Sequence, residues 1–282
     1  MTAARPNDAL INCYLPITED VKPRVCAVSY LNTVPLVWGM LNGAGPSDGS
    51  GVFDLRFALP SECADQIASG EADIGIVPVI EMERQKLDYF PGTGIACHGP
   101  VRSILLVSKV PFREIRTLAT DAGSRTSVQL ARVILAEKFA ATPRLISRRA
   151  DLTTMLGEAD AALVIGDPAL RLDPTTLPFE TLDLGGEWVA MTSLPMVFAV
   201  WAGRKEIVQD RYARAFTASC RYGLTRIDEI VRSETAARGF PEALVRKYLT
   251  EHIVFELAEH DYAGLKLFLE HAMRLERQAI SA

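Results

Sequence analysis

The sequence predicts an α/β protein of two lobes around a cleft, with the second lobe inserted into the first. Three observations carry this prediction. The chain has 282 residues, a comfortable length for two lobes. Short apolar runs alternate with helical segments, which is the rhythm of parallel sheets. Finally, the run "MVFAVW" leads out of the second set of elements into a mostly helical C-terminal part.

The first lobe begins with a repeated strand-helix pattern. We expect strands at "RVCAVSY", "FDLRFAL" and "ADIGIVPV". A helix is expected to begin near Pro35, with Asn32 or Thr33 as its N-cap. A second helix, "PSECADQIASG", is expected to be capped by Ser61 and to end at Gly70. The three strands therefore fit a parallel sheet.

The second lobe is expected to follow a crossing at "SILLVSKVPF". It contains predicted strands at "TLATD", "PRLI" and "AALVIGD" and helices at "SRTSVQLARVILAEKFA" and "GGEWVAMTSLP". We place the crossings at 103–109 and 195–201, where they would form a hinge. This divides the chain into an N-terminal extension at 1–22, a first lobe at 23–104 and 201–282, and a second lobe at 105–200. "HIVFEL" is a candidate short strand among the C-terminal helices.

Composition argues against several classes of protein. The net charge is −5, from 30 Lys and Arg against 35 Asp and Glu, without a basic block, so we expect no nucleic-acid partner. No run approaches the roughly 20 apolar residues of a spanning helix, and the N-terminus lacks the pattern of a secretory signal. The five cysteines never show C-x-x-C spacing, which is typical of reduced thiols. We therefore expect a cytoplasmic protein without a membrane partner; the sequence does not predict its oligomeric state.

The standard catalytic motifs for metal, nucleotide or nucleophilic chemistry are missing. "GTG" at 92–94 is interpreted only as a turn, and the four histidines share no ligand spacing. We expect no metal and no cofactor. His98 is a candidate for lining the cleft, because it lies between a strand and the first crossing.

Neutral and hydroxyl-bearing side chains gather instead in "SYLNT", "GPVRS" and "GSRTS", each where a strand meets a loop or a helix. The last segment opens a helix, whose free N–H groups favour a carboxylate or phosphate. The alternative is that Ser124 or Thr126 only caps this helix and that Arg125 faces solvent. Asp167 either caps a short helix or faces the cleft. We expect Glu187 to serve a helix start and Trp188 to lie in the core.

A family resemblance then becomes visible. "AVSYLNTVPLVWGM" resembles the opening motif of the chorismate dehydratases, the first enzymes of the futalosine route to menaquinone. "EADIGIVPVIE", "DAGSRTSVQLARVIL", "VIGDPAL" and "DLGGEWVAMTSLPMVFAVW" match in the same order, so the similarity runs from about 24 to 274. The resemblance implies a fold similar to type II periplasmic binding proteins and a cytoplasmic enzyme without cofactor or metal.

The resemblance also implies the site. Its catalytic residues would be Asn32 and Ser103. The substrate-binding candidates in the three hydroxyl-bearing segments are Ser29, Tyr30, Thr33, Arg102, Ser124, Arg125, Thr126 and Ser127. The expected substrate is chorismate, and the expected product is 3-[(1-carboxyvinyl)oxy]benzoate. Two alternatives stay open: a 1,4-dihydroxy-6-naphthoate synthase of the same pathway, which "SYLNTVPL" disfavours, and a cytoplasmic solute-binding or sensor protein without catalysis.

Overall fold

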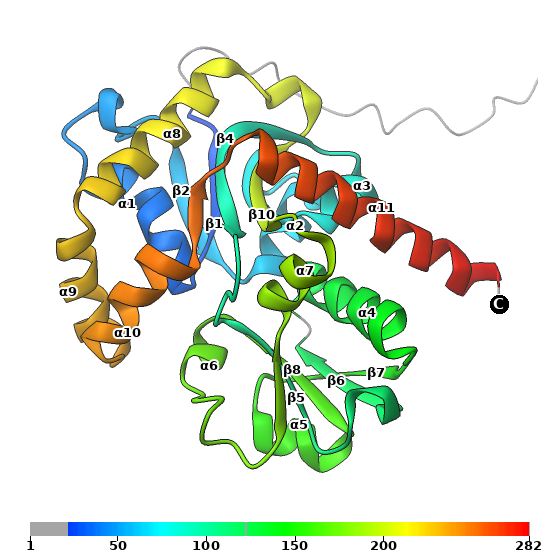
Figure 1. Ribbon diagram of the computed structural model, residues 1–282. Helices are drawn as coiled ribbons and strands as arrows, with labels where there is room; N and C mark the ends of the chain where they lie inside the picture. Colours follow the sequence, from blue (N-terminus) through cyan, green and yellow to red (C-terminus); the bar gives the residue numbers. More distant parts are fainter. Residues whose placement is uncertain (1–21, 122, 282) are drawn as a thin grey trace, which may run out of the picture.

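A computed structural model describes residues 22–121 and 123–281, so the predicted extension at 1–22 lies almost wholly outside the described residues. Two sheets organise the chain, and Figure 1 shows them one above the other with helices around each. The six-stranded sheet has the order β11-β4-β10-β3-β1-β2, and the five-stranded sheet has the order β7-β6-β8-β5-β9. The second sheet is built entirely from residues between β4 and β10, so the second lobe is inserted into the first.

The bounds of the elements are as follows. The first sheet contains β1 (Arg24–Val28), β2 (Asp54–Ala58), β3 (Ile74–Pro78), β4 (Asp88–Cys97), β10 (Met196–Gly203) and β11 (Val254–Glu256). The second contains β5 (Ile104–Ser108), β6 (Thr117–Asp121), β7 (Arg144–Arg148), β8 (Ala161–Ile165) and β9 (Glu180–Asp183). The helices are α1 (Val34–Asn42), α2 (Pro60–Ser69), α3 (Ile80–Gln85), α4 (Arg125–Phe139), α5 (Leu152–Glu158), α6 (Gly166–Leu170), α7 (Leu184–Thr192), α8 (Asp210–Thr225), α9 (Ile227–Arg238), α10 (Glu242–Lys247) and α11 (Glu259–Ser281).

Both sheets are mixed rather than purely parallel. β1 pairs in parallel with β2 and β3, as the strand-helix rhythm predicts, whereas β10 runs antiparallel to both β3 and β4. In the second sheet, β6 is parallel to β7 and β8, while β5 runs antiparallel to β8 and β9. The antiparallel strands β5 and β10 are those by which the chain enters the second sheet and returns to the first, and β11 also pairs antiparallel with β4.

The predicted crossings are displaced from the observed ones. The first prediction, 103–109, overlaps β5, which is a fully buried strand of the second sheet. The second, 195–201, overlaps β10, which is a strand of the first sheet. The chain passes between the sheets at 98–103 and again at 184–195, where α7 lies. The predicted crossings thus overlap core strands, and the connections are the segments before them.

Two local predictions also need correction. "GTG" is not a turn: it lies inside β4, where a Cβ on Gly94 would approach Ala199 O to 2.7 Å. Ser61 does not cap α2, because Leu59 occupies the N-cap position and its N–H donates to Glu62 Oε2 at 2.8 Å. Thr33 stands at the N-cap of α1, one of the two predicted positions, without a side-chain capping bond. The helices α3 and α5 were not predicted.

The C-terminal helices tie the lobes together. In Figure 1, α8, α9 and α10 flank the first sheet, while α11 runs beside α4 of the second lobe. Gln129 Nε2 of α4 donates to Glu276 Oε1 at 2.7 Å, and His271 Nδ1 lies 2.9 Å from Glu137 Oε1. Among the described residues, no helix is long and apolar enough to cross a membrane.

The helix that follows the "SYLNT" segment is fixed by close backbone packing against α8. Ser219 Oγ, fully buried in α8, donates to Leu36 O at 2.8 Å and accepts from Met40 N at 3.0 Å. Glycines permit this approach, because a Cβ on Gly223 would lie 2.3 Å from Pro35 O. The position of Asn32, just before α1, therefore depends on this contact.

Because Gly223 has no room for a methyl group, we expect Gly223→Ala to lower the free energy of unfolding by about 1–3 kcal/mol. The matched control is Gly157→Ala, at the exposed end of α5, where an added Cβ meets nothing within 4 Å. The control should leave stability unchanged or raise it, since alanine favours a helix over glycine. Urea unfolding of the two variants is the measurement; equal stabilities would contradict the close-packing argument.

Candidate active site

The candidate site is a cavity between the lobes. Its wall comes from the ends of β1 and β3, the first crossing, the start of α4 and the end of β8. The lining residues are Val28, Tyr30, Asn32, Pro60, Pro78, Ile95, Val101, Ser103, Ile104, Gly123, Ser124, Arg125, Thr126, Ser127, Ile165, Gly166, Phe198 and Ala199. Residues from all three hydroxyl-bearing segments meet here, although they lie far apart in the sequence.

Three of the predicted site residues lie outside this lining. Ser29 is exposed, and its carbonyl accepts from Arg238 at 3.0 Å. Thr33 is buried behind the wall. Arg102 turns away from the cavity and donates to the carbonyls of Ala169 and Leu172, which holds the end of α6. Ser29 and Arg102 thus make contacts within the protein, whereas the Thr33 hydroxyl is buried without a hydrogen-bond partner among the described residues.

Ser103 and Asn32 meet at a residue that sequence reasoning missed. Tyr248 OH donates to Ser103 Oγ at 2.8 Å, and the exposed fractions of these two residues are 0% and 1%. Burial raises the pKa of Tyr248, while hydrogen bonds with Ser103 and Asn32 oppose the rise. Asn32 Oδ1 is buried without a partner among the described residues. Nothing local marked Tyr248, since "PEALVRKYL" is typical of an ordinary helix.

The backbone before Ser103 is held in an uncommon conformation. Arg102 has a φ of 66°, in the left-handed region that non-glycine residues rarely occupy. Asp183 stabilises it, because its carboxylate accepts from Val101 N at 2.9 Å and Arg102 N at 2.6 Å. The same carboxylate caps α7 through Gly186 N at 2.9 Å. Such conformations cluster at functional sites, where the surroundings over-determine them.

The start of α4 offers hydrogen-bond donors to an anion. Ser124 Oγ is buried and has no partner among the described residues. Thr126 Oγ1, in contrast, accepts from Ile80 N of the first lobe at 3.5 Å. Neither hydroxyl caps the helix. Together with the positive end of the helix dipole, Ser124 is the better placed group to bind a carboxylate.

Arg125 neither faces solvent freely nor stands as an isolated positive charge. Its guanidinium binds Asp65 of α2 at 2.8 Å and Glu81 of α3 at 3.0 Å, so it connects the second lobe to the first. Two carboxylates offset its charge. The cavity therefore depends on neutral donors more than on a cation for binding an anion.

A second connection between the lobes lies beside Tyr30. Both predicted roles of Asp167, helix cap and cleft acid, are wrong. Its Oδ1 accepts from Leu31 N at 3.0 Å, and its Oδ2 forms an ion pair with Arg238 of α9. Gly166 packs on the Tyr30 ring, where a Cβ would approach to 2.6 Å. Burial, with smaller contributions from Asp121 and Asp167, raises the pKa of Tyr30 to about 12, so this phenol stays protonated near neutral pH.

Among the lining residues that the structure describes, there is no Asp, Glu, His, Lys or Cys. His98 does not line the cavity: it is exposed, and its Nε2 lies 2.8 Å from Asp261 Oδ1. Glu187 stands in the first turn of α7 but pairs with Lys138, and Trp188 is fully buried in the core. Within 22–121 and 123–281, no group of three or more His, Cys, Asp or Glu could hold a metal ion.

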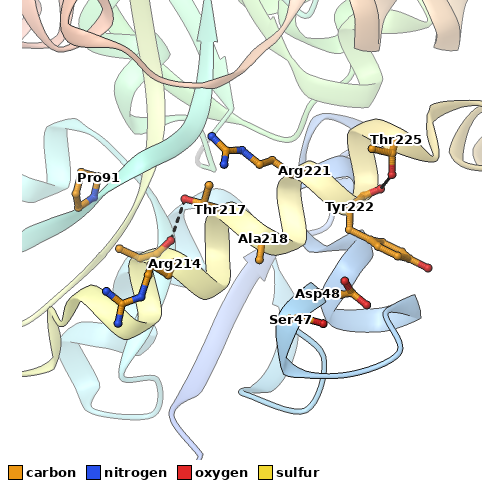
Figure 2. A pocket seen from close by; sticks show the side chains of 10 residues that line it. Ser47, Asp48, Pro91, Arg214, Thr217, Ala218, Arg221, Tyr222 and Thr225 are labelled. Atoms are coloured by element: carbon orange, nitrogen blue, oxygen red, sulfur yellow. Dashed lines mark hydrogen bonds between the residues drawn. The ribbon is translucent and has the colours of Figure 1, made fainter.

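Figure 2 shows a different hollow, on the outer side of α8, lined by residues such as Arg214, Thr217 and Arg221. Two of its hydroxyls are used within the helix, since Thr217 Oγ1 donates to Ala213 O at 3.0 Å and Thr225 Oγ1 to Tyr222 O at 2.8 Å. None of the predicted site residues lines it. The cavity between the lobes is therefore the better candidate.

Comparison with known proteins places the chain in a family. A family model described as menaquinone biosynthesis matches residues 23–274. The chain belongs to the menaquinone biosynthesis family. A chorismate dehydratase of Thermus thermophilus is 30% identical over 236 residues, which is 77% of this chain and 86% of that protein.

Solved structures agree with the predicted fold of this family member. Protein AF1704 from Archaeoglobus fulgidus has a TM-score of 0.76 at 16% identity and covers 92% of this chain and 99% of its own. The periplasmic aliphatic sulphonate binding protein SsuA from Escherichia coli has a TM-score of 0.58 at 14% identity, with 92% and 88% covered. The predicted two-lobed fold of the periplasmic binding protein type is confirmed.

The arrangement suits a member of the menaquinone biosynthesis family that acts on a small anionic molecule. Among the described residues, the cavity offers a partner-free hydroxyl on Ser124, a hydroxyl on Ser103, the N-terminus of α4 and the Asn32 amide, whose unpaired oxygen is an acceptor. Its remaining wall is largely apolar. A ring with carboxylates would find an apolar surface for the ring and neutral hydrogen-bond donors for its oxygens.

Proposed function

We propose that this protein is a chorismate dehydratase, a hydro-lyase that forms 3-[(1-carboxyvinyl)oxy]benzoate and water in the futalosine route to menaquinone. The observation that carries the proposal is the cavity in which Asn32 and Ser103, the residues of the dehydratase-like segments, meet between the lobes. The similarity to the Thermus thermophilus enzyme supports it. The proposal includes a cytoplasmic location and no cofactor or metal.

The chemistry asks little of the protein beyond positioning. Chorismate loses the C4 hydroxyl and the C3 proton, and the ring becomes aromatic. The C3–H bond is allylic to the ring double bond that is conjugated with the ring carboxylate. Removal of the C3 proton therefore gives a stabilised dienolate before the hydroxyl leaves. The enzyme then needs to hold one conformer, bind two carboxylates and favour this elimination over rearrangement. Neutral donors at the start of α4 and at Asn32 and Ser103 fit that task.

The base in this proposal is the substrate itself. Tyr30, Asn32, Ser103 and Ser124 are not basic near neutral pH. The carboxylate on the enolpyruvyl arm is attached through C3, and it reaches the C3 proton when the arm folds back. Asn32 and Ser103 would hold that conformer. Positioning of this kind can lower a barrier by roughly 7 kcal/mol or more.

The purified protein should dehydrate chorismate in the presence of a strong chelator and without nucleotide. The measurement is chromatography of the aromatic product over time. Activity that disappears with chelator and returns with zinc or magnesium would refute the metal-free part of the proposal. No product under any condition would refute the dehydratase, and turnover of a futalosine-derived substrate would then favour the naphthoate synthase.

Substrate assistance gives a second expected outcome. Asn32→Ala and Ser103→Ala should each lower kcat by roughly 100-fold or more, since each removes a group held at the reacting centre. His98→Ala, outside the cavity, should retain most of the activity. An analogue without the side-chain carboxylate should bind, as isothermal titration would show, yet fail to react. Normal dehydration of that analogue would mean that the protein supplies the base.

The anion-binding role of α4 can be separated residue by residue. Ser124→Ala should raise KM for chorismate about tenfold with a smaller change in kcat, because a hydrogen bond to a charged ligand is lost in ground state and transition state alike. Thr126→Val should raise KM less, since its Oγ1 already accepts from Ile80 N. Steady-state kinetics of both variants, with Ser127→Ala as a third, is the measurement. An unchanged KM in all three would place the carboxylate elsewhere.

A further inference from the structure

The hydroxyl of Ser103 has its hydrogen-bonding direction set by a residue outside the cavity. A serine hydroxyl carries one proton and two lone pairs. With Tyr248 OH as the donor to Ser103 Oγ at 2.8 Å, one lone pair of the serine is occupied and its proton is free to turn toward another acceptor. Ser103 lines the cavity, whereas Tyr248 is fully buried and does not. The serine proton is therefore available on the cavity side.

The segment that carries Tyr248 is built around the first crossing. Residues Tyr248–His252 form a π-helical turn, closed by the bond from Ile253 N to Tyr248 O at 3.2 Å. π-helical turns are rare and frequently occur at functional sites. At its other end, His252 Nδ1–H donates to Pro100 O at 2.8 Å. The turn thus holds the 98–103 crossing at Pro100 and again at Ser103.

We propose that Tyr248 is a positioning residue, which aims the Ser103 hydroxyl proton into the cavity and so makes Ser103 a hydrogen-bond donor to the substrate. This inference rests on the proposed dehydratase function. Asn32 lies close to the same phenol, because it opposes the burial-induced rise in the pKa of Tyr248. Burial raises that pKa, which keeps the phenol protonated and able to donate. A hydrogen bond in such a dry interior is stronger than one in water.

The test compares two tyrosine-to-phenylalanine variants. Tyr248→Phe should lower kcat roughly 10- to 100-fold, while KM for chorismate changes less than about threefold, because Tyr248 does not line the binding cavity. The matched control is Tyr262→Phe, whose hydroxyl accepts from Gly92 N at 2.8 Å away from the site. The control should keep kcat within about twofold. An unchanged kcat in Tyr248→Phe, or an equal loss in both variants, would overturn the proposal.

A double variant distinguishes positioning from general support of the fold. If Tyr248 acts through Ser103, then Ser103→Ala with Tyr248→Phe should be about as active as Ser103→Ala alone. Fully additive losses would overturn the proposal. If the activity of Ser103→Ala is too low to measure, the proposal is tested by comparing the changes in kcat and in KM of Tyr248→Phe with those of Tyr262→Phe.

A crystal structure of Tyr248→Phe gives a readout that does not depend on activity. Ser103 should lose its single side-chain conformer and populate a second one, because the bond that fixed it is gone. An unchanged single conformer would overturn the inference even if chorismate is the substrate. Conversely, a wild-type protein that fails to dehydrate chorismate refutes the proposed function. The positioning role of Tyr248 is then still tested by the number of Ser103 conformers in the Tyr248→Phe structure.

Discussion

The carboxylate of Asp167 joins the two lobes at the point where the site is built. It accepts from Leu31 N at 3.0 Å and pairs with Arg238, whose guanidinium also donates to Ser29 O at 3.0 Å. The turn that carries Tyr30 and Asn32 is therefore tied to the second lobe through its own backbone. The ion pair is only partly exposed, with 17% and 22% of its side chains accessible, so it is screened less than a surface pair. The loss of either partner would leave a half-buried charge and loosen the turn.

Arg125 performs the corresponding task on the far side of the cavity, through Asp65 and Glu81. These two connections hold the lobes together on both sides of the cavity. Arg125, which lines the cavity, and Asp167, next to the lining residue Gly166, are both paired across the lobes. What remains for a ligand is the partial charge at the start of α4 and the dipoles of Asn32, Ser103 and Ser124. Such dipoles stabilise developing negative charge without a large reorganisation when it appears.

Local signals were enough to predict the parts of this site that are local. The passage from an apolar strand to a polar turn identified "SYLNT", and hydroxyls ahead of a periodic helix identified "GSRTS". Sequence reasoning did not predict the role of a residue where that role depends on contact with a residue distant in the sequence. Gly94 was interpreted as part of a turn, yet it is a glycine because the backbone of β10 lies too close for a side chain. Tyr248 and Ser103 are 145 positions apart, and Asp167 and Arg238 are 71 apart, so no spacing rule would pair them.

The absence of a lining base among the described residues is itself favourable for a dianionic substrate. A carboxylate in the wall would repel both carboxylates of the proposed substrate, chorismate, and in the proposed mechanism it would compete with the one that folds back toward C3. A site without such a group leaves the protein to restrict conformation, which requires rigid walls. That rigidity is visible in three separate contacts: the glycine-mediated approach of α1 to α8, the Asp183 carboxylate that holds the first crossing, and the π-helical turn that presents Tyr248. Each contact fixes the position of the backbone rather than of a side chain. The orientation of the hydroxyl and amide groups in the cavity therefore depends on the fold of the backbone.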